Sequence, residues 1–191
     1  MPRVVVIGGI NGAGKTTASR ELLTGVLRIP TYVNADAIAF GLNMLNPDGQ
    51  AIRAGRVMLD YLHELAANRE DFAFETTLAA RTYASWLKEL RAMGYEVYLY
   101  YFWLRSADVA ITRVAERVQR GGHSIPTHTI RQRYAKSTRN FFELYRSLTV
   151  EWRVYDNSEG LSRLIAVGSE DQEFILDGDT WLDIERSAHH G

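Results

Sequence analysis

The sequence predicts an α/β fold with a central parallel sheet and helices on both of its faces. The opening run Arg3-Val-Val-Val-Ile-Gly8 is β-branched and bounded by glycines, as expected for a strand that is buried on both sides. Strand-like and helical segments then alternate along the chain, which is typical of parallel sheets with right-handed crossovers. The composition, 46% apolar and 24% charged, is that of an average globular chain.

The expected elements follow one another in order along the chain. Strands are expected at residues 3–8, 31–34, 72–75, 97–104 and 152–155. Helices are expected at residues 15–27, 82–93, about 107–119 and 127–148, and residues 35–68 are expected to be helical, with an amphipathic helix at 51–68. A short C-terminal tail, residues 160–191, contains strand-like runs at 164–167 and 173–176. We expect these strands to form the central sheet of a three-layer fold.

Composition and organisation bound the class of protein. The 191 residues contain no internal repeat and no Pro- or Ser-rich linker, so we expect a single domain over residues 1–191. The absence of cysteine excludes a disulfide framework, a thiol nucleophile and cysteine-ligated metal sites. The longest strongly apolar run, residues 97–104, is far shorter than the ~20 residues of a membrane helix. We therefore expect a soluble, cytoplasmic protein that does not engage membranes.

The charge is balanced overall and uneven locally. A formal net charge of −1 argues against a general binder of nucleic acid or membrane surfaces. Residues 113–153, however, hold eight arginines and Lys136 against three glutamates. This local excess of basic side chains predicts an anion site.

A glycine-rich loop lies directly between the first predicted strand and the first predicted helix. It reads Gly9-Ile-Asn-Gly-Ala-Gly-Lys15-Thr16 and matches G-x-x-x-x-G-K-[ST] in full. In such a P-loop, backbone N–H groups and the helix N-terminus surround a polyphosphate, and the lysine reaches the β- and γ-phosphates. The sequence thus predicts a P-loop NTPase or kinase fold that binds ATP, with Thr16 on Mg²⁺. The predicted nucleotide-binding residues are Gly9, Asn11, Gly12, Ala13, Gly14, Lys15, Thr16 and Thr17.

Two isolated acids, Asp36 and Glu75, follow predicted strands. Because ligands bind at the carboxyl ends of parallel strands, both are expected beside the phosphates. Asp36 is the candidate catalytic base, and its alternative role is a helix N-cap. Glu75 is expected to bind substrate hydroxyls or, through water, Mg²⁺, and its alternative is an ordinary helix-entry or loop carboxylate. Asn34 and Thr76 are predicted to contact the substrate beside them.

A helical lid that carries arginines is expected over about residues 113–139. Arg113, Arg117 and Arg120 fall near i, i+4 and i+7 and lead into Gly121-Gly122-His123, which is typical of a hinge. Such a lid would exclude water and stabilise the transferred phosphoryl group. The alternative for any single arginine is a solvated helix face. The predicted catalytic cations are Lys15, Arg117, Arg120 and Arg133, and the predicted substrate contacts on the lid are His123 and Arg131.

These blocks together resemble the zeta toxin family of P-loop kinases, and more closely its small, stand-alone bacterial branch. Matching blocks beyond the P-loop include Val33-Asn-Ala-Asp36, Phe74-Glu-Thr-Thr-Leu78 and Tyr155-Asp-Asn-Ser158. Toxins of this family phosphorylate a hydroxyl of UDP-N-acetylglucosamine and are held inactive by a small antitoxin. The resemblance implies this acceptor, an antitoxin partner, ATP and Mg²⁺ as cofactors, and a place for Asn157 near the adenine. It also implies that the five main strands lie in the order 2-3-1-4-5, as in small kinases of this type.

The residues favour an ATP-dependent kinase that transfers the γ-phosphoryl group to a hydroxyl of a small molecule. The sequence contains no N-K-x-D guanine motif and no L-S-G-G-Q transporter motif. One alternative is a nucleotide-dependent regulatory ATPase that acts on a partner protein. Another is a 5′-hydroxyl nucleic-acid kinase, which the basic stretch motivates although nucleic acid is not the expected partner.

Overall fold

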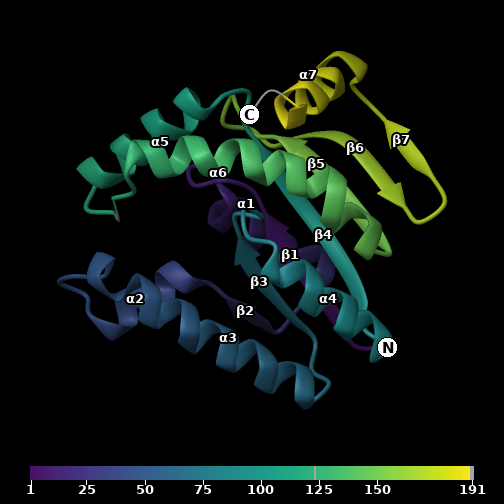
Figure 1. Ribbon diagram of the computed structural model, residues 1–191, viewed down its shortest axis with the longest axis horizontal. Coiled ribbons are helices and arrows are strands. Elements are labelled where there is room, and N and C mark those ends of the chain that lie inside the picture. The colour runs from purple at the N-terminus through teal and green to yellow at the C-terminus, as the bar shows by residue number, and fades with distance from the viewer. Residues whose placement is uncertain (123, 190–191) are drawn as a thin grey trace.

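A seven-stranded sheet forms the centre of the protein in the computed structural model, which describes residues 1–122 and 124–189 (Figure 1). The strand order is β2-β3-β1-β4-β5-β6-β7. The strands are β1 (Arg3–Gly8), β2 (Thr31–Val33), β3 (Phe72–Thr76), β4 (Glu96–Trp103), β5 (Glu151–Asp156), β6 (Arg163–Ser169) and β7 (Glu173–Ile175).

The first five strands confirm the predicted parallel order 2-3-1-4-5. The two strand-like runs of the tail extend this parallel core into a mixed sheet, because β6 pairs antiparallel with β5 and β7 pairs antiparallel with β6. Residues 4–7 of β1 are fully or almost fully buried. This burial explains why β1 is continuously apolar rather than alternating.

The helices match the expected segments, with several interruptions. They are α1 (Lys15–Glu21), α2 (Ala35–Leu42), α3 (Ala51–Ala67), α4 (Thr82–Ala92), α5 (Ala107–Gln119), α6 (Thr127–Asn140) and α7 (Gly178–His189). π-helical turns continue α1 over Leu22–Leu27 and α6 over Phe141–Tyr145. A 3-10 turn at Arg146–Leu148 follows the second of these, and another at Asp48–Gln50 precedes α3.

The helical region expected over residues 35–68 is divided into α2 and α3 by a loop. Asn43 Oδ1 accepts hydrogen bonds from the backbone N–H groups of Leu45 and Asn46, each at 3.1 Å. Asn46 Oδ1 in turn accepts one from the N–H of Gly49 at 3.1 Å. Side-chain bonds of this kind compete with the helical backbone pattern. The helical region expected over 35–68 is therefore interrupted here, whereas the helix expected at 51–68 is confirmed by α3.

The helix α7 was not predicted, although its amphipathic spacing is present in the sequence. Trp181, Ile184 and Ala188 are buried and lie at i, i+3 and i+7. Trp181 stacks on Trp152 of β5, with 5.8 Å between the ring centroids. The tail thus adds a helix as well as two strands to the fold.

The sheet separates two apolar cores, which gives the three layers that the sequence predicts. One core includes Phe74 and Trp181 and lies under α3, α4 and α7. The other includes Ile7, Leu23 and Val114 and lies under α1 and α5. Among the described residues, no helix combines the length and the apolar character needed to cross a membrane.

The carboxyl ends of β1, β2 and β3 meet at one edge of the sheet. The P-loop follows β1, α2 follows β2, and Glu75 lies near the end of β3. In Figure 1, the α2–α3 part and the α5–α6 part lie on opposite sides of this edge. The fold therefore places the residues that follow these strands between two helical parts.

Candidate active site

The P-loop makes a tight turn between β1 and α1. Gly14 has a φ of +76°, and Asn157 lies so close to it that a Cβ atom would collide. Gly9 has a φ of +138° and packs in the same manner against the carbonyl group of Phe102. Both positions therefore require glycine. The first N–H groups of α1, which begins at Lys15, have no helical carbonyl before them and suit a polyphosphate.

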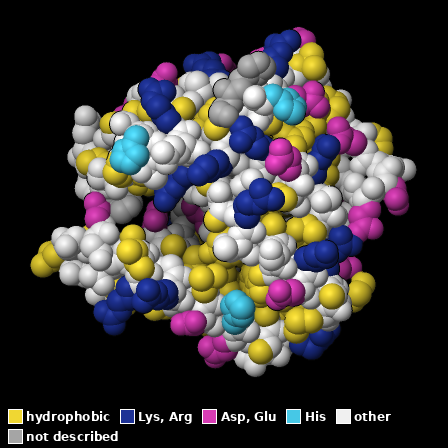
Figure 2. Space-filling model, viewed as in Figure 1, with side chains coloured by type: hydrophobic (Ala, Val, Ile, Leu, Met, Phe, Trp, Pro, Cys, Tyr) yellow, Lys and Arg dark blue, Asp and Glu magenta, His cyan; other side chains and the backbone are white. Residues whose placement is uncertain are grey.

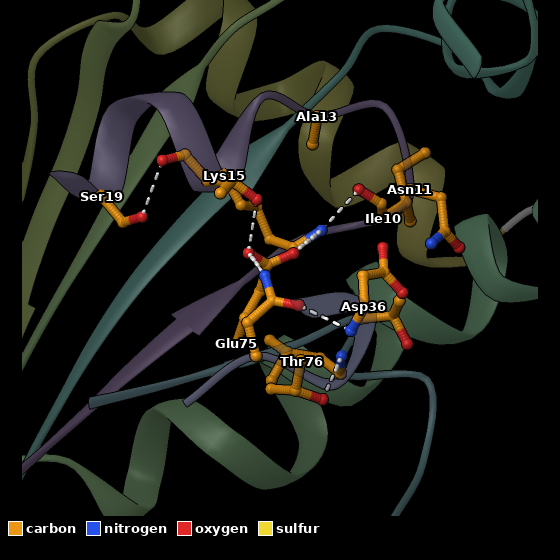
Figure 3. Close-up of polar contacts among 12 residues, drawn as sticks. Ile10, Asn11, Ala13, Lys15, Ser19, Asp36, Glu75 and Thr76 are labelled. Atoms are coloured by element: carbon orange, nitrogen blue, oxygen red, sulfur yellow. Dashed lines mark hydrogen bonds and ion pairs between the residues drawn. The ribbon is translucent and has the colours of Figure 1, made fainter. Parts of the chain in front are cut away.

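Glu75 is the centre of a hydrogen-bond network beneath the P-loop (Figure 3). Its Oε2 accepts hydrogen bonds from Thr16 Oγ1 at 2.8 Å, Tyr32 OH at 2.6 Å and Asn34 Nδ2 at 2.8 Å. Its Oε1 lies 3.3 Å from Lys15 Nζ. One carboxylate thus connects α1 with β2, β3 and the residue that precedes α2.

The network keeps Glu75 ionised. Burial alone raises the pKa of Glu75, but the charge of Lys15 and the hydrogen bonds from Tyr32 and Thr16 outweigh it, so that this pKa lies below its usual value. Lys15 is only 5% exposed, and its Nζ also donates to the carbonyl of Ile10 at 2.9 Å. The motif lysine is therefore held in place by one charge and one backbone carbonyl.

Thr16 and Glu75 suit the Mg²⁺ site that the motif implies. Mg²⁺ prefers oxygen ligands, and proteins generally hold it through one or two side chains together with substrate phosphates and water. A hydroxyl and an ionised carboxylate, 2.8 Å apart at the start of α1, supply this donor set. The residues present are thus compatible with Thr16 as a ligand and Glu75 as a ligand through water.

Asp36 lies in the first turn of α2, and its side chain is 52% exposed. The N-cap of α2 is Asn34, whose Oδ1 accepts hydrogen bonds from the N–H groups of Asp36 at 2.8 Å and Ala37 at 3.4 Å. The N-cap alternative for Asp36 is therefore wrong. Asn34, predicted to contact substrate, uses both ends of its amide to hold α2 and Glu75. In Figure 3, Asp36 lies across the site from Lys15.

Three arginines of the expected lid reach the P-loop region. Arg117 Nη1 lies 3.9 Å from Asp36 Oδ2. Arg133 Nη1 donates to Asn11 Oδ1 at 2.8 Å. Arg113 Nη2 donates to the carbonyl of Ser158 at 2.8 Å. The α5–α6 part is therefore connected to the P-loop, to α2 and to the segment after β5.

Two predicted lid arginines lie elsewhere. α5 ends at Gln119, so Arg120 is its C-cap, and its exposed side chain lines none of the cavities at the P-loop. Arg131 Nη2 donates to Asp108 Oδ1 at 2.6 Å on the surface. The structure does not bring these two side chains to the site. His123, the remaining predicted lid contact, lies outside the described residues.

Two adjoining cavities flank Asp36. The phosphate-side cavity, of about 220 Å³, also contacts Arg113 and Arg117. The acceptor-side cavity, of about 290 Å³, also contacts Thr76 and Arg133. The two cavities share four lining residues, which are Asn11, Lys15, Asp36 and Glu75. A molecule on either side is therefore within reach of the same lysine and the same two carboxylates.

A larger cavity, of about 690 Å³, lies on the opposite side of the P-loop. Asn157 lines it and is 6% exposed, and its Nδ2 donates to the carbonyl of Ala13 at 2.6 Å. Tyr155 and Phe102 line it as well, and their rings stack with 5.2 Å between the centroids. The amide of Asn157 thus supports the P-loop from within this cavity, and its place near the adenine stays a prediction.

The remaining predicted P-loop positions divide into two kinds. Asn11, Gly12, Gly14, Lys15, Thr16 and Thr17 line the phosphate-side cavity. The N–H of Gly9 donates to the carbonyl of Thr76 at 3.2 Å, and that of Ala13 donates to the carbonyl of Ile10 at 3.1 Å. Gly9 and Ala13 thus shape the loop through their backbone.

Two residues of the site, Tyr32 and Tyr83, were missed, and Arg113 was expected on the lid but not among its catalytic cations. Tyr32 precedes Asn34 by two positions, and this period of two, which places side chains on one face of a strand, is the signal that could have found it. Arg113 shares a helix face with Arg117, at i and i+4. Tyr83 lines the acceptor-side cavity from α4, and no sequence motif marks it.

Much of the basic stretch is compensated by acids. Arg146 pairs with Glu173 at 3.2 Å, and Arg153 pairs with Glu151 at 2.8 Å. Arg131 pairs with Asp108, as described above. The positive excess of residues 113–153 is thus divided between the site and surface ion pairs. This division weakens the argument for a nucleic-acid acceptor.

The family model described as an AAA domain matches residues 4–141 of this chain. The chain is 29% identical over 126 residues to an uncharacterized protein of Haemophilus influenzae, and the match covers 66% of this chain and 88% of that protein.

Solved structures share the fold at low sequence identity. AvrRxo1-ORF1, in complexes with AvrRxo1-ORF2 that contain sulphate ions or ATP, is 13% identical, with TM-scores of 0.77 and 0.75 over 96% of this chain. This chain covers only 63% of the length of that protein. The PezAT toxin-antitoxin system of Streptococcus pneumoniae matches with a TM-score of 0.64 and 14% identity, over 99% of this chain and 86% of that one. A gluconokinase of Sinorhizobium meliloti matches with a TM-score of 0.52 and 17% identity, over 81% of this chain and 82% of that one. The expected P-loop kinase fold is confirmed.

Proposed function

The chain belongs to the AAA domain family, and from this premise we propose that it is an ATP-dependent kinase that phosphorylates a hydroxyl group of a small molecule. One observation carries the proposal. Asp36 is a half-exposed carboxylate that lines both the phosphate-side and the acceptor-side cavity. A base that activates an acceptor hydroxyl against a γ-phosphate has to stand at this boundary.

The nucleotide half of the proposal is supported by the P-loop geometry. Lys15 and the first N–H groups of α1 face the phosphate-side cavity, and Arg113 and Arg117 line it from α5. The cavity beyond Gly14, with Tyr155 and Phe102, offers apolar walls for the base of the nucleotide. AvrRxo1-ORF1, whose fold is similar, has been solved with ATP.

The acceptor half is supported by the polar lining of the second cavity. Asp36 would accept the proton of the attacking hydroxyl, and Arg133 would face the negative charge that develops on the transferred phosphoryl group. Mg²⁺, when bound by Thr16 and the phosphates, neutralises charge on the β- and γ-phosphate oxygens. Glu75 holds Lys15 and Thr16 in position throughout. The acceptor oxygen then bonds to the γ-phosphorus as the bond to the β,γ-bridging oxygen breaks, and ADP leaves.

The acceptor and the partner rest on likeness alone. The resemblance to zeta toxins makes UDP-N-acetylglucosamine the first acceptor to test. The fold similarity to the PezAT toxin-antitoxin system supports an antitoxin-like protein as a partner. Cytoplasmic location and a single domain over residues 1–191 are proposed from the sequence.

The test is phosphoryl transfer from γ-labelled ATP with Mg²⁺ into a panel of sugar nucleotides, nucleosides and sugars. We expect labelled product with the native chain and a loss of about 10²–10⁴-fold in Asp36→Asn, which is the usual contribution of general-base catalysis. ATP affinity should change by less than about threefold, because Asp36 acts on the acceptor.

Asp108→Asn serves as the matched control, since Asp108 pairs with Arg131 on the surface. This variant should transfer the phosphoryl group at the native rate. The regulatory ATPase alternative predicts slow phosphate release, no labelled acceptor and equal rates in both variants. That result would remove the kinase assignment.

A further inference from the structure

A fourth cavity opens from the site between the α2–α3 part and the α5–α6 part. It measures about 540 Å³, and we call it the apolar cavity. One wall is formed by Phe40, Met44, Leu45 and Pro47, and the opposite wall includes Arg117, Gly121 and Gly122. Figure 2 shows the hollow between these two parts. A cavity of about 150 Å³ suffices for benzene, so this one has room for an aromatic ring.

The first wall of this cavity exposes large apolar side chains on α2 and on the loop that follows it. Phe40 is 54% exposed, Met44 65% and Leu45 93%. The hydrogen bonds that Asn43 and Asn46 accept from the loop backbone fix its turns. Contiguous apolar surface that a structure holds in water is informative, because it marks a place where another molecule binds.

The apolar cavity is continuous with the proposed acceptor site. Asp36 and Ala39 line both the apolar cavity and the acceptor-side cavity. Arg117 lines the apolar cavity and the phosphate-side cavity. A molecule whose hydroxyl contacts Asp36 can therefore extend into the apolar cavity without leaving the site. This continuity favours part of the acceptor as the occupant over a separate protein.

The charged side chains that line the apolar cavity show no positive excess. They are two aspartates, Asp36 and Asp48, and one arginine, Arg117, whose Nη1 lies 3.9 Å from Asp36 Oδ2. A lining without a positive excess gives a diphosphate no net attraction. The apolar wall therefore favours an uncharged group, in contrast to UDP-N-acetylglucosamine, the acceptor that the resemblance to zeta toxins suggests.

We infer that the acceptor carries an uncharged apolar group of about the size of an aromatic ring beside its reactive hydroxyl, and that Phe40, Met44 and Leu45 select it. This inference rests on the proposed function and deepens it by assigning the acceptor class. It separates neutral aryl or alkyl alcohols from acceptors that carry a diphosphate next to the hydroxyl-bearing unit.

The test uses three sets of acceptors with matched hydroxyl groups. Glucosides, galactosides and N-acetylglucosaminides are each supplied as the methyl glycoside, the 4-nitrophenyl glycoside and the UDP derivative. In at least one set, we expect kcat/KM for transfer from ATP to be about tenfold higher with the 4-nitrophenyl glycoside than with the other two. A preference for the methyl or UDP form would overturn the inference.

Saturation-transfer NMR with the same compounds provides a readout that needs no turnover. The nitrophenyl protons should receive saturation from the native chain, and Leu45→Ser and Met44→Ser should weaken binding of the 4-nitrophenyl glycosides by about tenfold. Both side chains are exposed, so the fold tolerates the change. Leu182→Ser, on α7 and 49% exposed, is the matched control and should bind as the native chain does.

The two readouts separate the inference from the proposed function. Nitrophenyl contact that is lost in Leu45→Ser, together with no transfer to any compound, supports the inference about binding and counts against the kinase. Transfer that is unaffected by Leu45→Ser and Met44→Ser, or no nitrophenyl contact at all, overturns the inference. In that case the apolar wall serves a protein partner.

Discussion

The two sides of Asp36 are built in contrasting ways. On the nucleotide side, Lys15 and Asn157 are 5% and 6% exposed, and their polar atoms have close partners. On the acceptor side, Met44 and Leu45 are largely exposed, and the ion pair across the cleft, from Asp36 to Arg117, spans 3.9 Å. One side is complete before a ligand arrives, and the other becomes complete when a ligand binds.

This difference reflects the two ligands. A triphosphate is the same in every cycle, so preorganised donors can face it without rearrangement. An acceptor is recognised by shape and apolar contact, and a wall that is exposed without ligand gains its burial energy only on binding. The contrast predicts that substitutions on the nucleotide side lower both the stability of the fold and the use of ATP. Substitutions that face the acceptor should lower phosphoryl transfer alone.

The largest effect should come from Lys15→Met. Methionine keeps most of the volume of the buried side chain and removes the charge that faces the phosphates. We expect transfer to fall by about 10²–10³-fold or more, the range for loss of one preorganised donor. Lys88→Met, on the exposed face of α4, is the control and should retain native activity. A loss below tenfold in Lys15→Met would contradict the preorganised nucleotide side.

Glu75→Ala should produce the largest loss of stability. It leaves Lys15 buried without its carboxylate, and breaking a buried pair in this manner costs about 3–5 kcal/mol. Urea denaturation at neutral pH measures the change in the free energy of unfolding. Glu89→Ala, on an exposed position of α4, should change it by less than about 0.5 kcal/mol.

The pH dependence of the same variant sharpens this prediction. Because the pKa of Glu75 is lower in the fold than in the unfolded chain, its contribution is present above the unfolded pKa and is lost as pH falls through the folded value. The difference between native chain and Glu75→Ala should therefore shrink in acid. A difference that is constant with pH would show that packing, rather than charge, is responsible.

Arg117→Ala and Arg120→Ala should differ although the residues are three positions apart. Arg117 lines the phosphate-side cavity and contacts Asp36, whereas Arg120 is exposed at the C-cap of α5. We expect about a tenfold or greater loss of kcat in the first variant and less than a twofold change in the second. Steady-state transfer kinetics measure both. Equal losses would indicate that the lid rearranges on binding to bring both arginines to the phosphates.

The smallest effect concerns Tyr100 of β4 and is confined to alkaline pH. Burial raises the pKa of Tyr100 to about 12, so the folded chain retains this proton more tightly than the unfolded chain does. Its contribution is fully present below the unfolded pKa near 10 and decreases as pH rises toward 12. Tyr100→Phe should lose less stability than the native chain between pH 10 and 12 in thermal melts. Tyr61→Phe, at a 42% exposed position, should follow the native curve.

The sequence sufficed for those parts of the molecule that local chemistry determines. The strands and the P-loop follow from β-branched runs and from a turn that favours glycine at Gly9 and Gly14. The order of the strands in the sheet came from the family resemblance and was confirmed. The position of Glu75 beside Lys15 and Thr16 follows from parallel topology, since strands that end together bring their following residues together.

Other parts depend on where individual side chains point, which the sequence pattern does not record. The sequence places the end of α5 correctly at Gln119, but the side chain of Arg120, at the C-cap, is exposed and away from the site. Arg131 pairs with Asp108, which is 23 positions away in sequence. The cap of α2 is Asn34 rather than Asp36, a shift of two residues that changes which side chain is engaged.

The hydrogen bond from Asn157 to the carbonyl of Ala13 spans 144 positions of the chain. A ribosome therefore releases the whole P-loop motif long before it has synthesised the side chain that supports it. During translation, when N-terminal segments fold first, the nascent chain carries the motif without its support. This support of the P-loop is thus added late in biosynthesis, after Asn157 has left the exit tunnel. A translation product that stops before this residue carries the complete motif without this hydrogen bond.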